Sequence, residues 1–196
     1  RMTGVPFSVC VYCGSRNGVR SAYRDLALRL GTAIGRRGWQ LVYGGGRAGL
    51  MGAVADATLA AGGTVVGVIP ESLMNLEVGH AGLTELHVVQ TMHQRKQLMA
   101  ERSHAFIAMP GGIGTFEELF EVWTWRHLAY HDRPIGLLDA EGYWAPMLQF
   151  LRHSVAEGFM GDDQMAMLHS DDQVGRLLDT LATRAGDPTD DNFSRI

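Results

Sequence analysis

A repeating order of segments constrains the fold of this chain more than any single motif does: a short apolar run, then glycines, then apolar residues at helical spacing. The apolar run 7–13, for example, is followed by Gly14 and Ser15 and then by a helical pattern over 21–37. Strands that alternate with helices in this way predict right-handed βαβ units and a parallel sheet. The runs are apolar at both odd and even positions, which is typical of strands that helices cover on both faces.

The expected elements follow this rhythm along most of the chain. We expect strands over 7–13, 40–43, 64–69, 86–89, 105–109 and 134–138, and helices over 21–37, 50–61, 92–102, 116–128, 143–157 and 171–183. Together they predict an α/β fold with a doubly wound, mostly parallel, Rossmann-like sheet. The 196 residues are the size of one domain, which we assign to residues 7–184, and the polar segment 185–196 is expected to be a disordered tail.

Composition and charge exclude several classes of protein. Apolar residues make up 46% and charged residues 19% of the chain, as in a folded globule rather than a disordered segment. A net charge of −4 gives no basic surface for duplex nucleic acid, so we expect no nucleic-acid partner. No apolar run approaches the ~20 residues of a membrane span, and no leader-like segment opens the chain, so we expect a cytoplasmic protein without a membrane partner.

Two pairs of potential redox or metal ligands are better explained as structural. Cys10 and Cys13 lie inside one expected strand, where residues three apart point to opposite faces, so we expect two buried thiols in a reducing compartment. His127 and His131 are four apart and would share a helix face. Zinc needs a third ligand, and none stands at a convincing spacing, so we expect no metal.

Three expected strands end in glycine-rich turns, and in a parallel sheet these turns lie along the edge where ligands bind. The turns are Gly14-Ser15, Gly44-Gly45-Gly46 and Gly111-Gly112-Ile113-Gly114-Thr115. Glycine lets backbone amides approach an anion closely, and the third turn also opens a helix whose positive dipole favours phosphate. Three such turns on one edge favour a ligand with a phosphate group. The alternative is that these glycines merely end strands and cap helices.

Cations at the start of another expected helix also point to an anion. Thr91 is a suitable N-cap for the helix over 92–102, so Arg95 and Lys96 fall in its first turn or so. Positive charges there oppose the helix dipole at a cost of about 0.3–1 kcal/mol each. An anionic ligand or a carboxylate partner would offset that cost, whereas two solvated charges are the plainer alternative.

The segment from Thr115 to Glu118 has two interpretations. As structure it is a capping box, with Thr115 at the N-cap and Glu118 at the third helical position reaching back to it. As chemistry, Glu118 is a carboxylate beside the expected phosphate turn, where it could orient water or stabilise an oxocarbenium-like carbon. The motif by itself leaves both interpretations open.

These motifs, in this order, resemble those of one known family. Residues 110–118 carry the pattern P-G-G-x-G-T-x-x-E, and Met92-His93-x-Arg95-Lys96 precedes it. With C-G-S at 13–15, L-V-Y-G-G-G at 41–46 and E-V-W-T-W at 121–125, the chain is similar to the LONELY GUY family from about residue 8 to residue 159. Members of that family are cytokinin riboside 5′-monophosphate phosphoribohydrolases, long labelled lysine decarboxylase-like.

The resemblance implies a hydrolase that cleaves the N-glycosidic bond of a nucleoside 5′-monophosphate to free base and ribose 5-phosphate. It implies a homodimer or an assembly of dimers, and no metal or organic cofactor. The family's catalytic pair falls on Arg95 and Glu118. Counting the glycine turns and the neighbours of the motifs, the expected substrate-binding positions are Gly14, Ser15, Gly44, Gly45, Gly46, Glu77, Met92, Arg95, Lys96, Gly112, Ile113, Gly114, Thr115, Phe116, Glu117, Glu118 and Thr124.

Other functions stay open to different degrees. An AMP nucleosidase of nucleotide salvage, without a cytokinin role, would share the fold and the site. A non-catalytic nucleotide or cofactor carrier would need neither Arg95 nor Glu118. A pyridoxal-phosphate lysine decarboxylase needs a Schiff-base lysine, and Lys96 is the single lysine of the chain. The glycine spacing over 44–49 matches the dinucleotide fingerprint, but it follows the second expected strand instead of the first.

Overall fold

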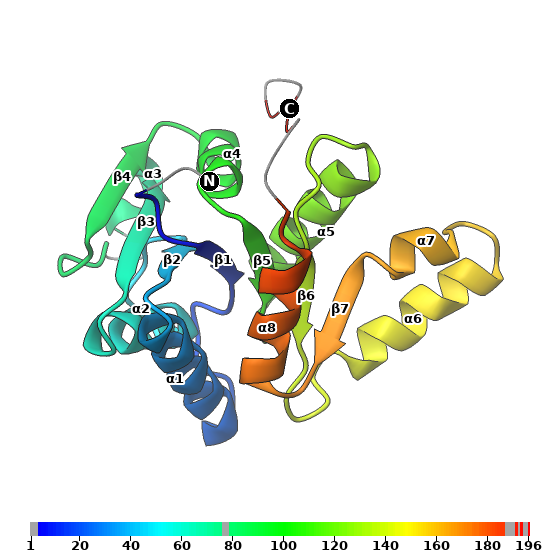
Figure 1. Ribbon diagram of the computed structural model, residues 1–196, viewed down its shortest axis with the longest axis horizontal. Coiled ribbons are helices and arrows are strands. Elements are labelled where there is room, and N and C mark those ends of the chain that lie inside the picture. Colours follow the sequence, from blue (N-terminus) through cyan, green and yellow to red (C-terminus); the bar gives the residue numbers. More distant parts are fainter. Residues whose placement is uncertain (1–3, 76–78, 187–190, 192, 194–195) are drawn as a thin grey trace.

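A seven-stranded parallel sheet forms the centre of the computed structural model, which describes residues 4–75, 79–186, 191, 193 and 196 (Figure 1). The strand order is β4-β3-β2-β1-β5-β6-β7, and every neighbouring pair runs parallel. The strands are β1 (Ser8–Tyr12), β2 (Gln40–Tyr43), β3 (Thr64–Pro70), β4 (Glu85–Val89), β5 (Ala105–Ala108), β6 (Ile135–Leu138) and β7 (Leu168–Asp171). The predicted doubly wound α/β fold is thus confirmed.

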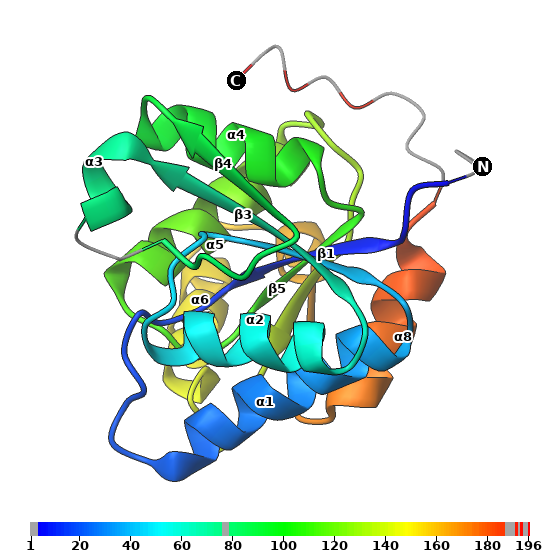
Figure 2. The same ribbon diagram turned by 90° about the vertical axis from the view of Figure 1, so that its left-hand side faces the viewer.

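Helices cover both faces of the sheet (Figure 2). One face carries α1 (Ser21–Arg36), α2 (Gly49–Ala60) and α8 (Val174–Arg184). The other carries α4 (Met92–Glu101), α5 (Ile113–His127) and α6 (Ala145–Ala156). Two short helices, α3 (Glu71–Leu73) and α7 (Asp162–Met165), complete the described elements. No helix in the described part of the chain combines the length and the apolar character that crossing a membrane requires.

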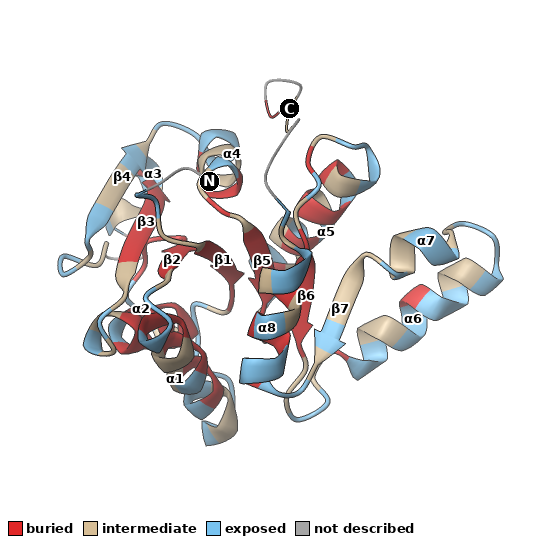
Figure 3. Ribbon diagram, viewed as in Figure 1, coloured by how far each residue is buried: buried red, intermediate tan, exposed pale blue. Residues whose placement is uncertain are grey.

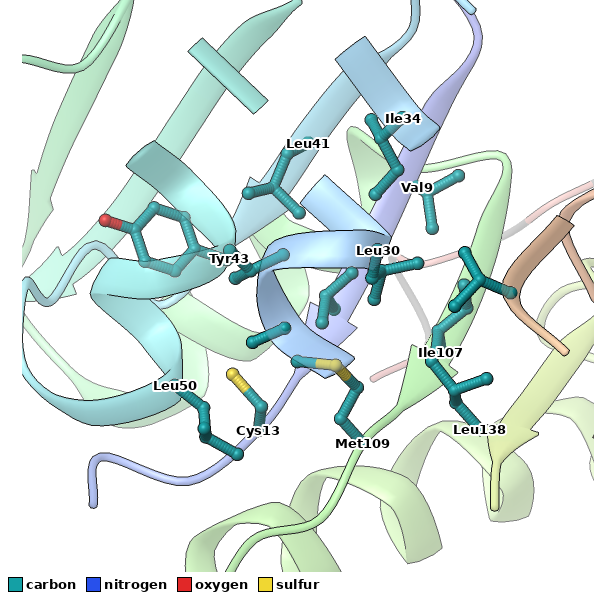
Figure 4. Close-up of a cluster of buried hydrophobic side chains, with 14 of the residues drawn as sticks. Val9, Cys13, Leu30, Ile34, Leu41, Tyr43, Leu50, Ile107, Met109 and Leu138 are labelled. Carbon is teal, nitrogen blue, oxygen red and sulfur yellow. The ribbon is translucent and has the colours of Figure 1, made fainter. Parts of the chain in front are cut away.

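Alternate residues of the central strands enter two separate cores, so that the centre of the sheet is buried on both sides, whereas the edge strands β4 and β7 are not (Figure 3). Val9 and Cys13 pack under α1 and α2 together with Leu30, as Figure 4 shows. Cys10, between them in sequence, packs on the opposite face. The predicted opposite orientation of the two cysteines is therefore confirmed, and both are free, buried thiols. Burial raises the pKa of both thiols, which makes them poor nucleophiles.

The chain order places a topological switch point between β1 and β5. From β1 the chain moves outward through β2 and β3 to β4, and then it returns to β5 on the other side of β1. The loops after β1 and β5 therefore leave the sheet side by side, and the backbone N–H of Gly14 donates to the Pro110 carbonyl oxygen at 3.1 Å. Ligands of such sheets bind at this point.

The sequence-based expectations were wrong for one polar strand, for one short helix and for the first residues of two helices. The edge strand β7 and the short helix α7 were not expected, because His169, Ser170 and Asp171 give little apolar signal. The helix expected over 171–183 begins instead at Val174. α5 begins at Ile113, three residues before the expected start, and this shift matters for the site.

Most of the segment 185–196, expected to be a disordered tail, lies outside the described residues. Where it is described, it contacts the domain. Asp191 accepts an ion-paired hydrogen bond from Arg133 Nε at 2.6 Å, and Phe193 is buried against the Arg133 guanidinium.

Candidate active site

A cleft of about 550 Å³ opens at the switch point between β1 and β5. Its walls come from the loop after β1, residues 14–18, and from the loop after β5 with the start of α5, residues 110–115. α4 contributes Arg95 and Lys96, and α5 contributes Glu118. The sheet edge thus brings together residues from three of the sequence motifs.

The amino terminus of α5 faces this cleft without a side-chain cap. Gly112 is the N-cap residue, and the first turn of this helix carries no acidic residue. Helix geometry leaves the first N–H groups without an intrahelical acceptor, and the helix dipole adds partial positive charge there. A Cβ on Gly112 or Gly114 would meet no atom of the described residues within 4 Å. Without side chains at these two positions, a ligand in the cleft can approach the backbone at the start of α5 closely.

The helix start excludes the capping interpretation of Glu118. Thr115 is the third residue of α5 and lies behind the N-cap residue Gly112, so it cannot itself be the N-cap. A Cβ on Gly111 would lie 2.1 Å from Thr115 Oγ1, which shows that Thr115 packs back against the glycine loop. Glu118 lies about one turn into the helix and lines the cleft. Of the two interpretations of this segment, the capping box of Thr115 and Glu118 is thus wrong.

The glycines after β2 serve packing, and only the first of them lines the cleft. A Cβ on Gly44 would lie 2.3 Å from Arg95 Nη2. Gly45 has a φ of +76° and lies against Ile69 and Leu86, and Gly46 forms an isolated bridge with Gly79.

Arg95 is a buried cation that the backbone holds in place. Its Nε donates to the Val68 carbonyl oxygen at 2.9 Å and its Nη2 to the Gly44 carbonyl oxygen at 2.5 Å. The predicted N-cap at Thr91 is confirmed: its Oγ1 accepts from the Gln94 N–H at 3.1 Å. Arg95 is only 5% exposed, so the alternative of a solvated charge fails for it.

Lys96 has two carboxylate partners on α5. Its Nζ donates to Glu117 Oε1 at 2.6 Å and to Glu121 Oε2 at 3.0 Å. Burial lowers the pKa of Lys96, but the two carboxylates outweigh burial and hold it above its ordinary value. Carboxylate partners therefore offset the unfavourable helix position. The partner Glu121 was not predicted, because its contact spans 25 positions of sequence.

The Glu118 carboxylate lies beside the end of β1. Burial raises the pKa of Cys10 and Cys13, and the charge of Glu118 raises both further. Burial also raises the pKa of Tyr12, with Glu118 as one of the charges that add to the shift. Glu118 itself is half-buried.

The remaining predicted site residues divide between the cleft and other places. The cleft includes Gly14, Ser15, Met92, Ile113 and Glu117. Phe116 instead packs edge-on against Trp144, with ring centroids 5.9 Å apart. Thr124 is exposed on α5, and its hydroxyl donates to the Phe120 carbonyl oxygen at 2.6 Å. Glu77 lies outside the described residues.

The polar residues of the cleft lining that sequence reasoning missed include Arg16, Asn17, Tyr23 and Tyr143. The Tyr143 hydroxyl donates to the Gly111 carbonyl oxygen, a contact across 32 positions that no local pattern indicates. Arg16 directly follows the Gly14-Ser15 turn, so its adjacency to that turn was the available signal.

The two histidines that were expected to share a helix face do not. His127 is the last residue of α5, and His131 lies beyond the helix in a buried position. His131 Nε2 donates to the Val122 carbonyl oxygen at 2.8 Å, while Nδ1 accepts from the Arg133 N–H at 3.0 Å. Across the described ranges, no three His, Cys, Asp or Glu side chains are grouped as a metal site.

Known proteins match this chain over most of its length. A family profile described as "Possible lysine decarboxylase" matches residues 51–181. The cytokinin riboside 5′-monophosphate phosphoribohydrolase of Rhodococcoides fascians is 55% identical over 156 residues, which cover 79% of each chain. Proteins of the same name from Oryza sativa and Arabidopsis thaliana are 48% and 49% identical, over 83% and 88% of this chain and 67% and 81% of theirs.

Solved structures show the same fold at greater distance. The molybdenum cofactor carrier protein of Chlamydomonas reinhardtii superposes with a TM-score of 0.69 at 21% identity, covering 91% of this chain and 96% of that one. The similarity to it extends to the fold alone. The matched family profile and the sequence identities of about one half to the phosphoribohydrolases, by contrast, show the family. This chain belongs to the LONELY GUY family, as its P-G-G-x-G-T-x-x-E motif indicates.

Proposed function

We propose that this protein hydrolyses the N-glycosidic bond of a nucleoside 5′-monophosphate, with a cytokinin riboside 5′-monophosphate or AMP as substrate. One observation carries the proposal: the open glycines at the start of α5 and the Glu118 carboxylate face the same cleft. The relatives named above, 48–55% identical to this chain, support the same reaction.

The helix itself sets a suitable spacing between phosphate and reaction centre. The phosphate binds at the backbone N–H groups of Gly114 and Thr115, where the helix dipole favours an anion. Glu118 follows Gly114 by four residues, a rise of about 6 Å along the helix. This separation is comparable to the length of a ribose 5-phosphate, so Glu118 reaches the C1′ end of the sugar.

Glu118 then acts on the bond between C1′ and the base. As that bond breaks, its electron pair leaves with the base and positive charge develops at C1′, which the carboxylate stabilises. A water held by Glu118 adds its oxygen to C1′ and gives up a proton. The base takes up a proton as it leaves, and the products are free base and ribose 5-phosphate.

Arg95 serves this site as a fixed positive charge. A guanidinium holds its proton too firmly to act as an ordinary acid, so it does not protonate the base. Two backbone carbonyls hold it in the wall of the cleft. There it keeps Glu118 ionised and aligned, or donates a hydrogen bond to the base or ribose.

A lysine decarboxylase is a poorer fit to the same cleft. Schiff-base formation needs a neutral amine, whereas two carboxylates hold the pKa of Lys96 above its ordinary value after burial is taken into account. Lys96 is the single lysine of the chain, so no other residue can take this role.

A product assay tests the proposal. Purified protein is incubated with AMP and, separately, with isopentenyl-adenosine monophosphate, and free base is quantified by chromatography. We expect base release from at least one of them, and a loss of about 100-fold or more in Glu118→Gln. Glu157→Gln, the same change at an exposed position outside the cleft, should match wild type.

The outcomes separate the candidate activities. The faster substrate decides between cytokinin activation and nucleotide salvage. A nucleotide that binds and stays intact would identify a carrier instead, and near-normal turnover in a folded Glu118→Gln variant would refute the role of Glu118.

We further propose a cytoplasmic homodimer. The apolar side chains of Met92, Phe120 and Leu128 are exposed on or just after α4 and α5, and burial in a dimer would remove them from water. Trp123 and Trp125 are buried within the chain and belong to its core. Light scattering tests the dimer, which has twice the 21.4 kDa of one chain. Two unpaired thiols support a reducing compartment.

A further inference from the structure

The loop after β1 holds Arg16 against the proposed phosphate site. The N–H groups of Leu50 and Met51 donate to the Gly14 carbonyl oxygen at 3.1 and 3.3 Å, while the Gly14 N–H donates to Pro110 at 3.1 Å. The loop is thereby tied to the start of α2 on one side and to the glycine loop before α5 on the other. Arg16 follows two residues later and lines the cleft.

A second glycine contact fixes the backbone of Arg16 itself. Gly49 has a φ of +60°, and a Cβ there would lie 2.5 Å from the Arg16 backbone nitrogen and 2.3 Å from the Ser15 carbonyl carbon. Only glycine combines that conformation with that approach. Arg16 therefore projects from an anchored backbone.

The cations of the cleft differ in what they already bind. Arg95 is bound to two backbone carbonyls, and Lys96 to two carboxylates. Arg16 is exposed and makes no hydrogen bond or ion pair with any residue that the structure describes. Among the described cations that line the cleft, Arg16 is the one whose hydrogen-bond donors are all available to a ligand.

The charge of the cleft depends on this residue. The described lining contains three cations, Arg16, Arg95 and Lys96, and two carboxylates, Glu117 and Glu118. Without Arg16 the charged side chains cancel, and a phosphate dianion would meet only the partial charge of the helix terminus. A guanidinium can donate two parallel hydrogen bonds to phosphate oxygens.

We infer that Arg16 is a phosphate-binding residue that contacts the 5′-phosphate from the loop after β1. This inference rests on the proposed function, since it concerns the phosphate of the same substrate. Arg16 makes the cleft select nucleoside monophosphates over nucleosides, because adenosine offers its guanidinium no charged acceptor.

Calorimetric titration with AMP and with adenosine tests the inference, using a Glu118→Gln background to keep AMP intact. We expect Arg16→Ala to weaken AMP binding about tenfold or more and to leave adenosine binding within about twofold. Arg16→Lys, which keeps the charge but loses the paired donors, should fall between the two. Arg24→Ala removes an exposed arginine of α1 outside the cleft and should match the background protein.

Unchanged AMP affinity in Arg16→Ala would overturn the inference, as would an equal loss for adenosine or an equal effect of Arg24→Ala. These results leave the proposed function standing wherever the wild-type protein releases base. Absence of both AMP binding and base release in wild type would overturn the two together.

Discussion

The guanidinium of Arg95 occupies the space that a side chain at position 44 would need. A Cβ on Gly44 would lie 2.3 Å from Arg95 Nη2 and 2.8 Å from the Met51 methyl carbon. The first glycine after β2 thus allows Arg95 to reach the carbonyl oxygens of Gly44 and Val68. In many turns glycine is needed for its conformational freedom. Position 44 needs glycine for a different reason, because it leaves room for the side chain of Arg95, 51 positions away.

Gly44→Ala should therefore displace Arg95. We expect kcat for nucleotide hydrolysis to fall about tenfold or more, because the fixed charge in the wall of the cleft moves. Overpacking should also lower the free energy of unfolding by about 1–3 kcal/mol. Steady-state kinetics and urea unfolding measure the two effects. Gly175→Ala, where the added Cβ meets only Arg37 Nη2 at 3.9 Å, is the matched control. Wild-type kcat in Gly44→Ala would show that Arg95 does not need its present position.

Gly114→Ala should separate binding from stability. The added methyl group would meet no described atom within 4 Å, and alanine favours a helix over glycine by up to about 1 kcal/mol. We expect the melting temperature to stay or rise while AMP affinity falls about tenfold, because the methyl group blocks close approach to the α5 amides. Thermal melts with and without AMP measure both. Unchanged AMP affinity would place the phosphate elsewhere in the cleft.

The sequence predicted the sheet well because its central strands are apolar throughout. Val9, Leu41 and Ile107 come from three neighbouring strands that pack into one core, so composition and periodicity alone locate them. The edge strand β7 was missed because three of its four residues, His169, Ser170 and Asp171, are polar.

The sequence predicted several residues of the site, but not how those residues are arranged in space. The cleft does contain Arg95, Gly112, Gly114 and Glu118. The pattern over 115–118 misled about the start of α5, because Gly112 provides the N-cap through its backbone conformation and not through a side chain. Contacts such as Lys96–Glu121 and Tyr143–Gly111 depend on tertiary packing, and no local pattern encodes them.

Tyr143 links the glycine loop to the start of α6, and Tyr143→Phe tests that link. The variant keeps the ring packing on Tyr23 and Trp144 but loses the hydroxyl that donates to Gly111. We expect stability to fall by only about 0.5–1.5 kcal/mol. KM for the nucleotide should rise several-fold with kcat less affected, because we propose that this loop contacts the phosphate and not C1′. Tyr130→Phe, at a tyrosine outside the cleft, is the control. A fall in kcat with unchanged KM would instead connect Tyr143 to the chemical step.

His131 should make folding sensitive to acid. Burial lowers its pKa to about 4, with the neighbouring Arg133 and Arg126 charges acting in the same direction and the Val122 and Asp191 contacts against it. Both ring nitrogens are committed in the neutral form, and a proton on Nδ1 would break the bond from the Arg133 N–H. The unfolded chain binds that proton near the ordinary value of about 6.5. The unfolded state therefore binds more protons, and stability is full above about pH 6.5 and falls as the pH drops toward 4.

His131→Gln should remove this dependence while keeping one donor and one acceptor. Between pH 7 and pH 5, wild type should lose about 2 kcal/mol more unfolding free energy than the variant does. Urea unfolding at the two pH values measures the difference. His153→Gln, an exposed histidine of α6, should lose as much as wild type. Equal losses in wild type and His131→Gln would mean that His131 takes up its proton in the folded protein without cost, so that its buried contacts do not hold it neutral.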